Sequence, residues 1–275
     1  MSIRGLAFDL DGTLLGRDEH VSERNIAAVR AARAAGLQVI VATARWYQLA
    51  EQAARELDPA GDDIDGPVIA CSGAQVRRLR DREDLLDLRL PNEFVEALFG
   101  ICDTDRCVAW AALDDDVVVK MDGKPDSLPP GLRQSSSLVD GADGARPRMV
   151  LIQGRDVCGR VEAELSEQWG DHVRFVESIS SAGKRLLTLT ATGADKGAAL
   201  TIACADLGIE PDDVVAFGDA ENDIEMFRVA RFSVAMGQAS PQVQAAATAV
   251  TAANTDDGVA VVLERLLRDG EDALR

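Results

Sequence analysis

Length, composition and charge limit what this chain can do. Its 275 residues are enough for two domains, and a hydrophobic content of 47% with only 4% aromatic residues predicts a globular protein with an aliphatic core. A formal net charge of −18 repels nucleic acid and anionic membrane surfaces, so we expect neither as a partner.

The cysteines and the first residues predict a cytoplasmic protein. The chain has 5 cysteines, an odd number with no Cys-x-x-Cys pair, which favours reduced thiols over a disulfide framework. Asp9 interrupts the first apolar run, so we predict no signal peptide. No apolar run reaches the ~20 residues that a membrane span needs. Nothing in the sequence indicates an oligomeric state.

Strand and helix patterns alternate in the first part of the chain. Ser22 is a suitable N-cap for a helix that ends near Gly36. The run 37–43 is almost entirely apolar, as a parallel strand covered on both faces should be. In chain order the pattern predicts a strand at 3–8, a helix at 22–35, a strand at 37–43, a helix at 47–57 and a strand at 67–73.

The pattern changes at the charged segment 76–84, which we interpret as the exit from a first domain. The run 186–191 alternates apolar and polar residues, as a half-exposed antiparallel strand should. The elements expected in this middle region are a helix at 92–102, strands at 107–112 and 116–121, a turn-rich stretch at 122–131, a strand at 148–154, a helix at 157–169 and strands at 173–177 and 186–191.

From Asp195 onward the α/β alternation returns. The expected elements are a helix at 196–207, a buried strand at 213–219, a helix at 221–229, a strand at 232–236, a helix at 240–246, a strand at 248–251 and a helix at 257–268. The simplest organisation is one α/β domain built from both ends of the chain, 1–81 and 187–275, with a second domain inserted at 82–186.

Two carboxylates end the first strand, in the stretch LAFDLDGTLL. Alternate strand residues point the same way, so Asp9 and Asp11 would lie ~6–7 Å apart and repel by ~2.5 kcal/mol at an effective dielectric of ~20. Either one carboxyl keeps a proton and serves as a general acid, or a divalent cation lies between the two. Gly12 allows a sharp turn that could carry Asp11 away from Asp9.

Other polar residues follow strands at the same predicted edge, where ligands of parallel α/β sheets bind. Thr43 and the amides after it open a helix, which makes an anion cradle in which Thr43 could also be the N-cap. Asp219, Asn222 and Asp223 follow a later strand, and Lys196 opens the helix after the insertion. The metal-type ligands are all oxygens, which favours Mg²⁺ over zinc. The hydroxyl, amide and ammonium groups suit the oxygens of a phosphate.

These residue types allow a two-step phosphoryl transfer. Asp9 could attack phosphorus and form an aspartyl-phosphate. Asp11 could protonate the leaving alcohol and then accept a proton from the water that hydrolyses the intermediate.

The motifs DLDGTLL, ATAR, DKG and GDAENDIEM, in this order, resemble the four motifs of the haloacid dehalogenase superfamily of phosphatases. The chain is similar to Cof-type members of subfamily IIB, whose cap is inserted between the second and third motifs. The resemblance covers about 1–80 and 186–268, and the cap matches only in position, length and texture. It implies a Rossmann-like three-layer α/β/α core with a parallel sheet, and an inserted α+β cap domain that sets substrate specificity.

The resemblance also implies roles for the carboxylates. Asp9 would be the nucleophile and a metal ligand, and Asp11 would be the acid/base that gives its backbone carbonyl to Mg²⁺. Asp219 would bind Mg²⁺, and Asp223 would support the metal or the lysine.

For the phosphoryl group the resemblance implies Thr43 and Lys196 as binding residues, with Asn222 nearby. The family motif usually has Gly where Ala44 stands here, and the Ala44 amide can still bind phosphate if φ is negative at that residue.

The rim of the site departs from the family pattern. Arg45 is followed by Trp46 where the family usually has Pro, and Ser72 and Gly73 stand where Asn-Gly is common. We expect these residues to contact the substrate or the cap.

The hypothesis is therefore a Mg²⁺-dependent phosphatase that hydrolyses a small-molecule phosphomonoester, such as a sugar phosphate or similar metabolite. A phosphomutase or phosphotransferase of the same superfamily is the first alternative, because the same aspartyl-phosphate can pass to another alcohol. A non-catalytic sensor of phosphorylated metabolites is the second, and it is disfavoured because no catalytic carboxylate is missing. The sequence does not specify the substrate.

Overall fold

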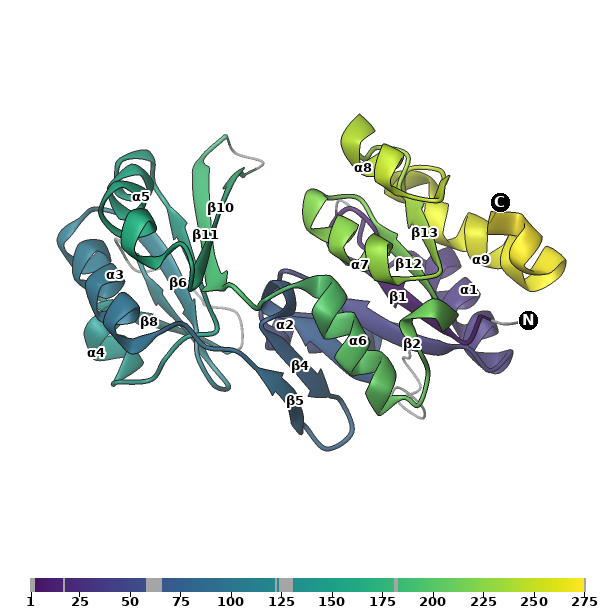
Figure 1. Cartoon of the computed structure of the whole chain (residues 1–275), viewed down its shortest axis with the longest axis horizontal. Coiled ribbons are helices and arrows are strands. Elements are labelled where there is room, and N and C mark those ends of the chain that lie inside the picture. The colour runs from purple at the N-terminus through teal and green to yellow at the C-terminus, as the bar shows by residue number, and fades with distance from the viewer. Residues whose placement is uncertain are drawn as a thin grey trace. The chain divides into compact units, whose positions relative to one another are not determined.

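The computed structural model describes residues 3–16, 18–57, 66–121, 123, 131–180 and 183–274. They form two compact units, each with its own sheet (Figure 1). The first unit combines both ends of the chain, Met1–Leu86 and Asp195–Arg275, and the second is Asp87–Ala194.

The first unit is built on a sheet of 8 strands. The strands are β1 Gly5–Phe8, β2 Gln38–Ala42, β3 Pro67–Ala70, β4 Gln75–Arg78, β5 Asp84–Asp87, β12 Val214–Gly218, β13 Phe232–Ala235 and β14 Ala249–Val250. Their order is β14-β13-β12-β1-β2-β3-β4-β5, parallel from β14 to β3, with β4 antiparallel to β3.

Helices cover both faces of this sheet. They are α1 Glu23–Ala34, α2 Tyr47–Glu56, α6 Lys196–Asp206, α7 Ile224–Val229, α8 Pro241–Ala246 and α9 Gly258–Asp269, with short 3₁₀ turns at η1 Cys71–Gly73, η2 Pro211–Asp213, η3 Glu221–Asp223, η4 Asn254–Asp256 and η5 Gly270–Leu274. On one face, apolar residues of α6, α7 and α8 share one hydrophobic core with Ala7 and Ile40. Leu6 and Phe8 alternate onto the opposite face and are also fully buried, as strands covered on both sides must be. The predicted three-layer fold class is therefore confirmed.

The second unit is a six-stranded sheet with helices on one face. Its elements are α3 Asn92–Thr104, β6 Val108–Ala112, β7 Val117–Lys120, β8 Leu132–Ser135, α4 Leu138–Ala142, β9 Met149–Gln153, α5 Arg155–Trp169, β10 Val173–Ile179 and β11 Arg185–Ala191. The strand order is β10-β11-β9-β6-β7-β8, antiparallel except for β7 and β8. The helices pack Phe94 and Val161 onto Ile152 and Leu187 in one core. An α+β unit inserted into an α/β unit is thus observed.

The charged segment 76–84 behaves differently from the prediction. It contributes most of β4 and the beginning of β5, which extend the first sheet, and the chain leaves the first unit only after Leu86. Arg77 is buried in β4 because Asp84 neutralises it through hydrogen bonds of 2.7 and 2.6 Å. At the other end β11 pairs with β9 and β10, so the second unit extends past residue 186 to Ala194.

Three further features bear on the predictions. The elements β8 and α4 were not predicted, and the turn-rich stretch 122–131 lies mostly outside the described residues. All five cysteines are free thiols and buried. Among the described helices, none combines the length and the apolar character needed to cross a membrane.

Candidate active site

Three neighbouring strands of the first sheet end in polar residues. Strands β12, β1 and β2 lie side by side and parallel, and Asp219, Asp9 and Thr43 are the residues that follow them. The Asp9 amide donates to the Phe217 carbonyl at 3.0 Å, which carries the strand pairing up to the carboxylate. The carboxyl ends of parallel strands meet at one edge of a sheet, so these side chains are brought together there.

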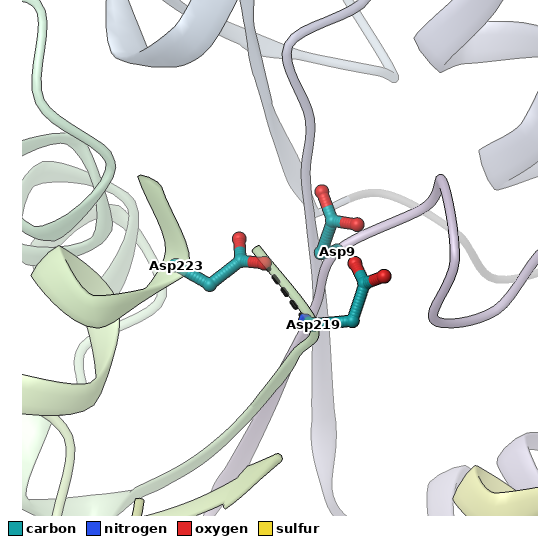
Figure 2. Close-up of side chains that lie close together, drawn as sticks. All are labelled: Asp9, Asp219 and Asp223. Carbon is teal, nitrogen blue, oxygen red and sulfur yellow. Dashed lines mark hydrogen bonds between the residues drawn. The ribbon is translucent and has the colours of Figure 1, made fainter. Parts of the chain in front are cut away.

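A buried lysine joins two of the predicted carboxylates. Lys196, the first residue of α6, is fully buried, and its Nζ donates to Asp9 Oδ1 at 2.6 Å and to Asp223 Oδ1 at 2.7 Å. Asp223 is fully buried as well, and its Oδ2 accepts from the amides of Asp219 and Ala220, each at 3.0 Å. The Asp223 carboxylate therefore holds the lysine on one side. On the other side it holds the turn after β12, through the bond from the Asp219 amide (Figure 2).

Asp9, Asp219 and Asp223 form a cluster of three carboxylates (Figure 2), in which one oxygen from each lies within 4.8 Å of the others. Lys196 is the one cation that contacts the cluster directly among the described residues, so negative charge is in excess. Asp219 Oδ1 is buried and has no hydrogen-bond partner within the described part of the chain. An unsatisfied carboxylate oxygen in an all-oxygen, acidic site is the donor chemistry that a hard divalent cation such as Mg²⁺ requires.

The crowding of charge appears in the pKa values of the cluster. Burial, and next the negative charge of Asp223, raise the pKa of Asp9 well above its usual value, against the opposing effect of Lys196. Burial and then the Asp223 charge raise the pKa of Asp219 to about 6. Burial by itself would lower the pKa of Lys196, but the charges of Asp223 and Asp9 outweigh it and raise that pKa. The lysine is therefore a permanent cation at neutral pH.

Gly12 lets the chain turn tightly over Asp219. Its φ is +81°, and a Cβ at this position would lie 2.2 Å from Asp219 Oδ2. Gln238 Nε2 donates both to the Gly12 carbonyl, at 2.5 Å, and to Asp219 Oδ2, at 3.2 Å. The backbone after Asp11 and the carboxylate after β12 are thus in direct contact, with no room for a side chain between them.

We expect Gly12→Ala to lower the free energy of unfolding by roughly 2–4 kcal/mol, because it combines a left-handed backbone with a steric clash against Asp219. Gly36→Ala is the matched control, since Gly36 has a φ of +91° but a Cβ there would meet no atom within 4 Å. Chemical denaturation gives the free energy of unfolding of each variant. Gly36→Ala measures the cost of a left-handed backbone alone, so the additional loss in Gly12→Ala measures the clash with Asp219. Equal losses of stability would contradict the clash at Asp219.

Asp11 lies apart from the carboxylate cluster. Its two oxygens accept a bidentate pair from Arg45, with Nε to Oδ2 at 2.8 Å and Nη2 to Oδ1 at 2.6 Å, and its side chain is 56% exposed. The predicted turn at Gly12 does separate Asp11 from Asp9. The side chain of Asp11 is therefore not one of the clustered carboxylates, and its predicted metal contact, through the backbone carbonyl, stays a prediction.

The segment after β2 differs from the expectation in one respect. Thr43 is not a helix N-cap, because α2 begins at Tyr47 and its N-cap is Trp46, which makes no side-chain capping bond. The Thr43 hydroxyl instead accepts from the Arg45 amide at 3.1 Å within the connecting loop. Ala44 is exposed and does not have a positive φ, so its amide meets the condition set for anion binding.

Ser72 and Gly73 lie in a tight turn beside the same loop. Cys71 and Ser72 have φ values of 51° and 57°, which non-glycine residues rarely adopt. The Ser72 amide donates to the Thr43 carbonyl at 3.1 Å, and a Cβ on Gly73 would lie 2.6 Å from the backbone of Asp195. The turn is packed against the start of α6, next to Lys196.

Two residues complete this edge. Asn222 lies in η3, and its Oδ1 is buried without a hydrogen-bond partner in the described ranges. Gln238, which contacts Gly12 and Asp219, was not predicted as a site residue. The signal for it was available, because Gln238 follows the parallel strand β13 at the same edge of the sheet.

Comparison with known proteins points to one family. The family model described as haloacid dehalogenase-like hydrolase matches residues 6–263. Among curated relatives, the 5-amino-6-(5-phospho-D-ribitylamino)uracil phosphatase YwtE of Bacillus subtilis (strain 168) is 27% identical, with the match covering 95% of this chain and 97% of that protein. The pyridoxal phosphate phosphatase YbhA of Escherichia coli (strain K12) is 28% identical over 94% and 97% of the two chains.

The fold has solved counterparts as well. The crystal structure of a haloacid dehalogenase-like hydrolase from Bacteroides thetaiotaomicron is similar with a TM-score of 0.81 and 25% identity. The similarity covers 96% of this chain and 99% of that one, so it includes both the first unit and the inserted unit.

Proposed function

The chain belongs to the haloacid dehalogenase-like hydrolases and is a phosphoric monoester hydrolase, and from this premise we propose a Mg²⁺-dependent phosphatase that acts through a phosphorylated Asp9. The observation that supports the proposal best is the buried contact of Lys196 with Asp9 and Asp223, beside Asp219 and at the carboxyl ends of parallel strands. Such a site can bind a phosphoryl group between a cation and a nucleophile.

The lysine leaves one oxygen of Asp9 available for attack. Lys196 occupies Oδ1, and Oδ2 makes no hydrogen bond with any described residue. In the first step Oδ2 bonds to phosphorus while the bond from phosphorus to the ester oxygen breaks. Lys196 keeps Asp9 oriented and remains charged, so it also attracts the oxygens of the phosphoryl group.

Asp11 is the proposed proton carrier. It gives a proton to the departing ester oxygen and later takes one from the water that attacks the phosphorylated Asp9, which releases phosphate and restores the carboxylate. Both Asp11 oxygens accept from Arg45 in this structure, as an ionised carboxylate would. A proton on one Asp11 oxygen makes that oxygen a weaker acceptor, so at least one contact to Arg45 weakens during the cycle.

The loop after β2 supplies the proposed phosphate contacts. The Thr43 oxygen accepts from the Arg45 amide, which leaves the hydroxyl hydrogen free to donate to a phosphoryl oxygen. The amide of the exposed residue Ala44 and the side chain of Asn222 would add donors. Arg45, Trp46, Ser72 and Gly73 would form the rim.

The carboxylate cluster fits Mg²⁺. Asp9 and Asp219 would hold the ion, with the buried Asp219 Oδ1 as a ready ligand, while Asp223 is saturated by Lys196 and two amides and would mainly orient the others. Bound there, the ion would offset the excess negative charge and polarise the phosphoryl group.

Without metal, Asp219 should destabilise the fold as pH rises. Its pKa is about 6 in the folded chain against 3.8 in an unfolded one, so the unfolded state releases its proton first and stability falls between these values. Because Asp219 is partly exposed, we expect a discounted loss of about 1–2 kcal/mol. Asp219→Asn should remove this loss, so in EDTA the variant should melt above the wild type at pH 7.5 and not at pH 4.

The same pair of proteins tests metal binding. Mg²⁺ should raise the melting temperature of the wild type and not that of Asp219→Asn. Asp256→Asn, an exposed acid in η4 outside the cluster, is the control that should respond as the wild type does. Equal stabilisation of all three proteins by Mg²⁺ would contradict the assignment of Asp219.

The proposed substrate is a small phosphomonoester, and the inserted unit is the proposed specificity cap. Both curated relatives described above are named as phosphatases of small phosphorylated compounds, and their matches cover nearly the whole of this chain. A phosphate-release screen over a panel of metabolites with Mg²⁺ tests the activity. The same screen in EDTA is the negative control and should release no phosphate. Isomerised sugar phosphate without released phosphate would favour a mutase instead.

A further inference from the structure

The second unit contains a cavity of its own, of about 630 Å³. It lies where α5 begins, between the end of β9, the segment before β6 and the ends of β10 and β11 that face each other. All the residues that line it belong to Asp87–Ala194. The side chains that matter for its chemistry are Arg106, Gln153, Arg155, Glu177, Lys184 and Arg185.

Strand pairing shows on which side of the sheet the cavity lies. Residues paired across antiparallel strands share a face, and Glu177 pairs with Leu187, while Arg185 pairs with Ile179. Leu187 belongs to the core under the helices, and Arg185 donates to Glu162 of α5 at 2.6 Å. The cavity is therefore at the open end of the helix-covered face of the second sheet. It needs no residue from the first unit.

The lining is cationic in a chain with an excess of acids. It has four basic side chains and one carboxylate, whereas the whole sequence has 29 basic and 47 acidic residues. Glu177 is already neutralised, because Arg185 donates to both of its oxygens at 2.7 and 2.9 Å. Basic side chains therefore outnumber acidic ones in the lining, and two of them, Lys184 and Arg155, bear on ligand binding.

Two of these cations are available to a ligand. The Lys184 ammonium contacts the neutral amide oxygen of Gln153 at 3.3 Å and no carboxylate in the described chain. The Arg155 side chain makes neither a hydrogen bond nor an ion pair with any residue that the structure describes. Both side chains are exposed, and Ile179, which is 64% exposed, adds an apolar wall.

The start of α5 adds backbone donors to the same place. The helix has 15 residues and begins at Arg155, and its N-cap is Gly154, which has no side chain to cap the first amides. The amides of the first turn have no carbonyl partner within the helix, and they carry the positive end of its dipole. Asp156 is in this turn but does not line the cavity. Anionic oxygens are the groups that such donors bind.

We propose that this cavity binds a small metabolite carrying a diphosphate or two phosphate groups, held by Arg155, Lys184 and the first amides of α5. Its volume is within the range of about 300–1,000 Å³ that is usual for small-molecule sites. Two unpaired cations and a helix start match two phosphate groups better than one. The site is distinct from the carboxylate cluster, and the inference does not depend on the proposed phosphatase activity.

Inorganic pyrophosphate is the probe, titrated calorimetrically into the full chain in EDTA. Without Mg²⁺ the carboxylate cluster repels anions, so this condition isolates the cavity. We expect saturable binding at one site, weakened at least tenfold in the double variant Arg155→Gln/Lys184→Gln. The control Arg133→Gln/Arg146→Gln removes two exposed or half-exposed charges of the same unit that do not line the cavity, and it should bind as the wild type does.

Three results would overturn the site. These are no saturable binding at millimolar pyrophosphate, equal weakening in both double variants, and equal affinity for pyrophosphate and orthophosphate. Both double variants should melt cooperatively within a few degrees of the wild type, which shows that each is folded whether or not the proposed phosphatase activity is found. If the wild type released no phosphate from any metabolite, the proposed function would be wrong, but the calorimetric result would still test the cavity.

Discussion

Asp9→Asn should lower the turnover of a generic aryl phosphate by on the order of 10⁴-fold or more while the protein remains folded. An amide oxygen is a far weaker nucleophile than a carboxylate, and no other described residue presents a carboxylate at the end of β1 in contact with Lys196. The substitution keeps the size of the side chain. It also removes one negative charge from a crowded cluster in which the pKa of Asp9 is raised, so the fold should not suffer.

The measurement is phosphate release with Mg²⁺, together with a thermal melt of each protein. Asp212→Asn is the control, because its side chain is 82% exposed and lies away from the cluster. It should retain the wild-type rate. If Asp9→Asn also retained that rate, Asp9 would not be the nucleophile.

Lys196→Met should cost both stability and activity. The substitution leaves Asp9 and Asp223 buried without their cation, and breaking a buried ion pair from one side typically costs about 3–5 kcal/mol. Turnover should fall by roughly 10²- to 10³-fold, because a donor to the phosphoryl group and the orientation of Asp9 are lost together. Urea unfolding in EDTA measures the first effect, and phosphate release measures the second.

A second variant identifies the cause of the lost stability. Lys196→Met/Asp223→Asn removes one of the two carboxylates that Lys196→Met leaves without a cation. An asparagine oxygen can still accept from the Asp219 and Ala220 amides. The double variant should therefore be more stable than Lys196→Met, although it should stay inactive. A double variant less stable than the single one would show that repulsion between Asp9 and Asp223 is not what Lys196 relieves.

The sequence by itself determined the alternation of strands and helices on either side of the insertion, and the edge of the first sheet at which the polar residues meet. The apolar run 37–43 favoured a parallel strand with both faces covered, and β2 is buried in that way from Val39 to Ala42. Because such strands end at a common edge, the polar residues after β1, β2 and β12 could be assigned to one site without coordinates. Lys196 was found by its place at the start of α6, where the α/β alternation resumes.

Only the tertiary structure decided which charges pair. Asp11 binds Arg45, and Gln238 joins Gly12 to Asp219 across more than two hundred residues of chain, and sequence spacing carries no information about such contacts. The segment 76–84 shows the same limit, because its charges suggested a solvated exit until Asp84 was seen to neutralise Arg77 inside the sheet. The cationic cavity of the second unit also escaped prediction. Its cations come from segments separated in the chain, and electrostatic balance depends on distances that only folding sets.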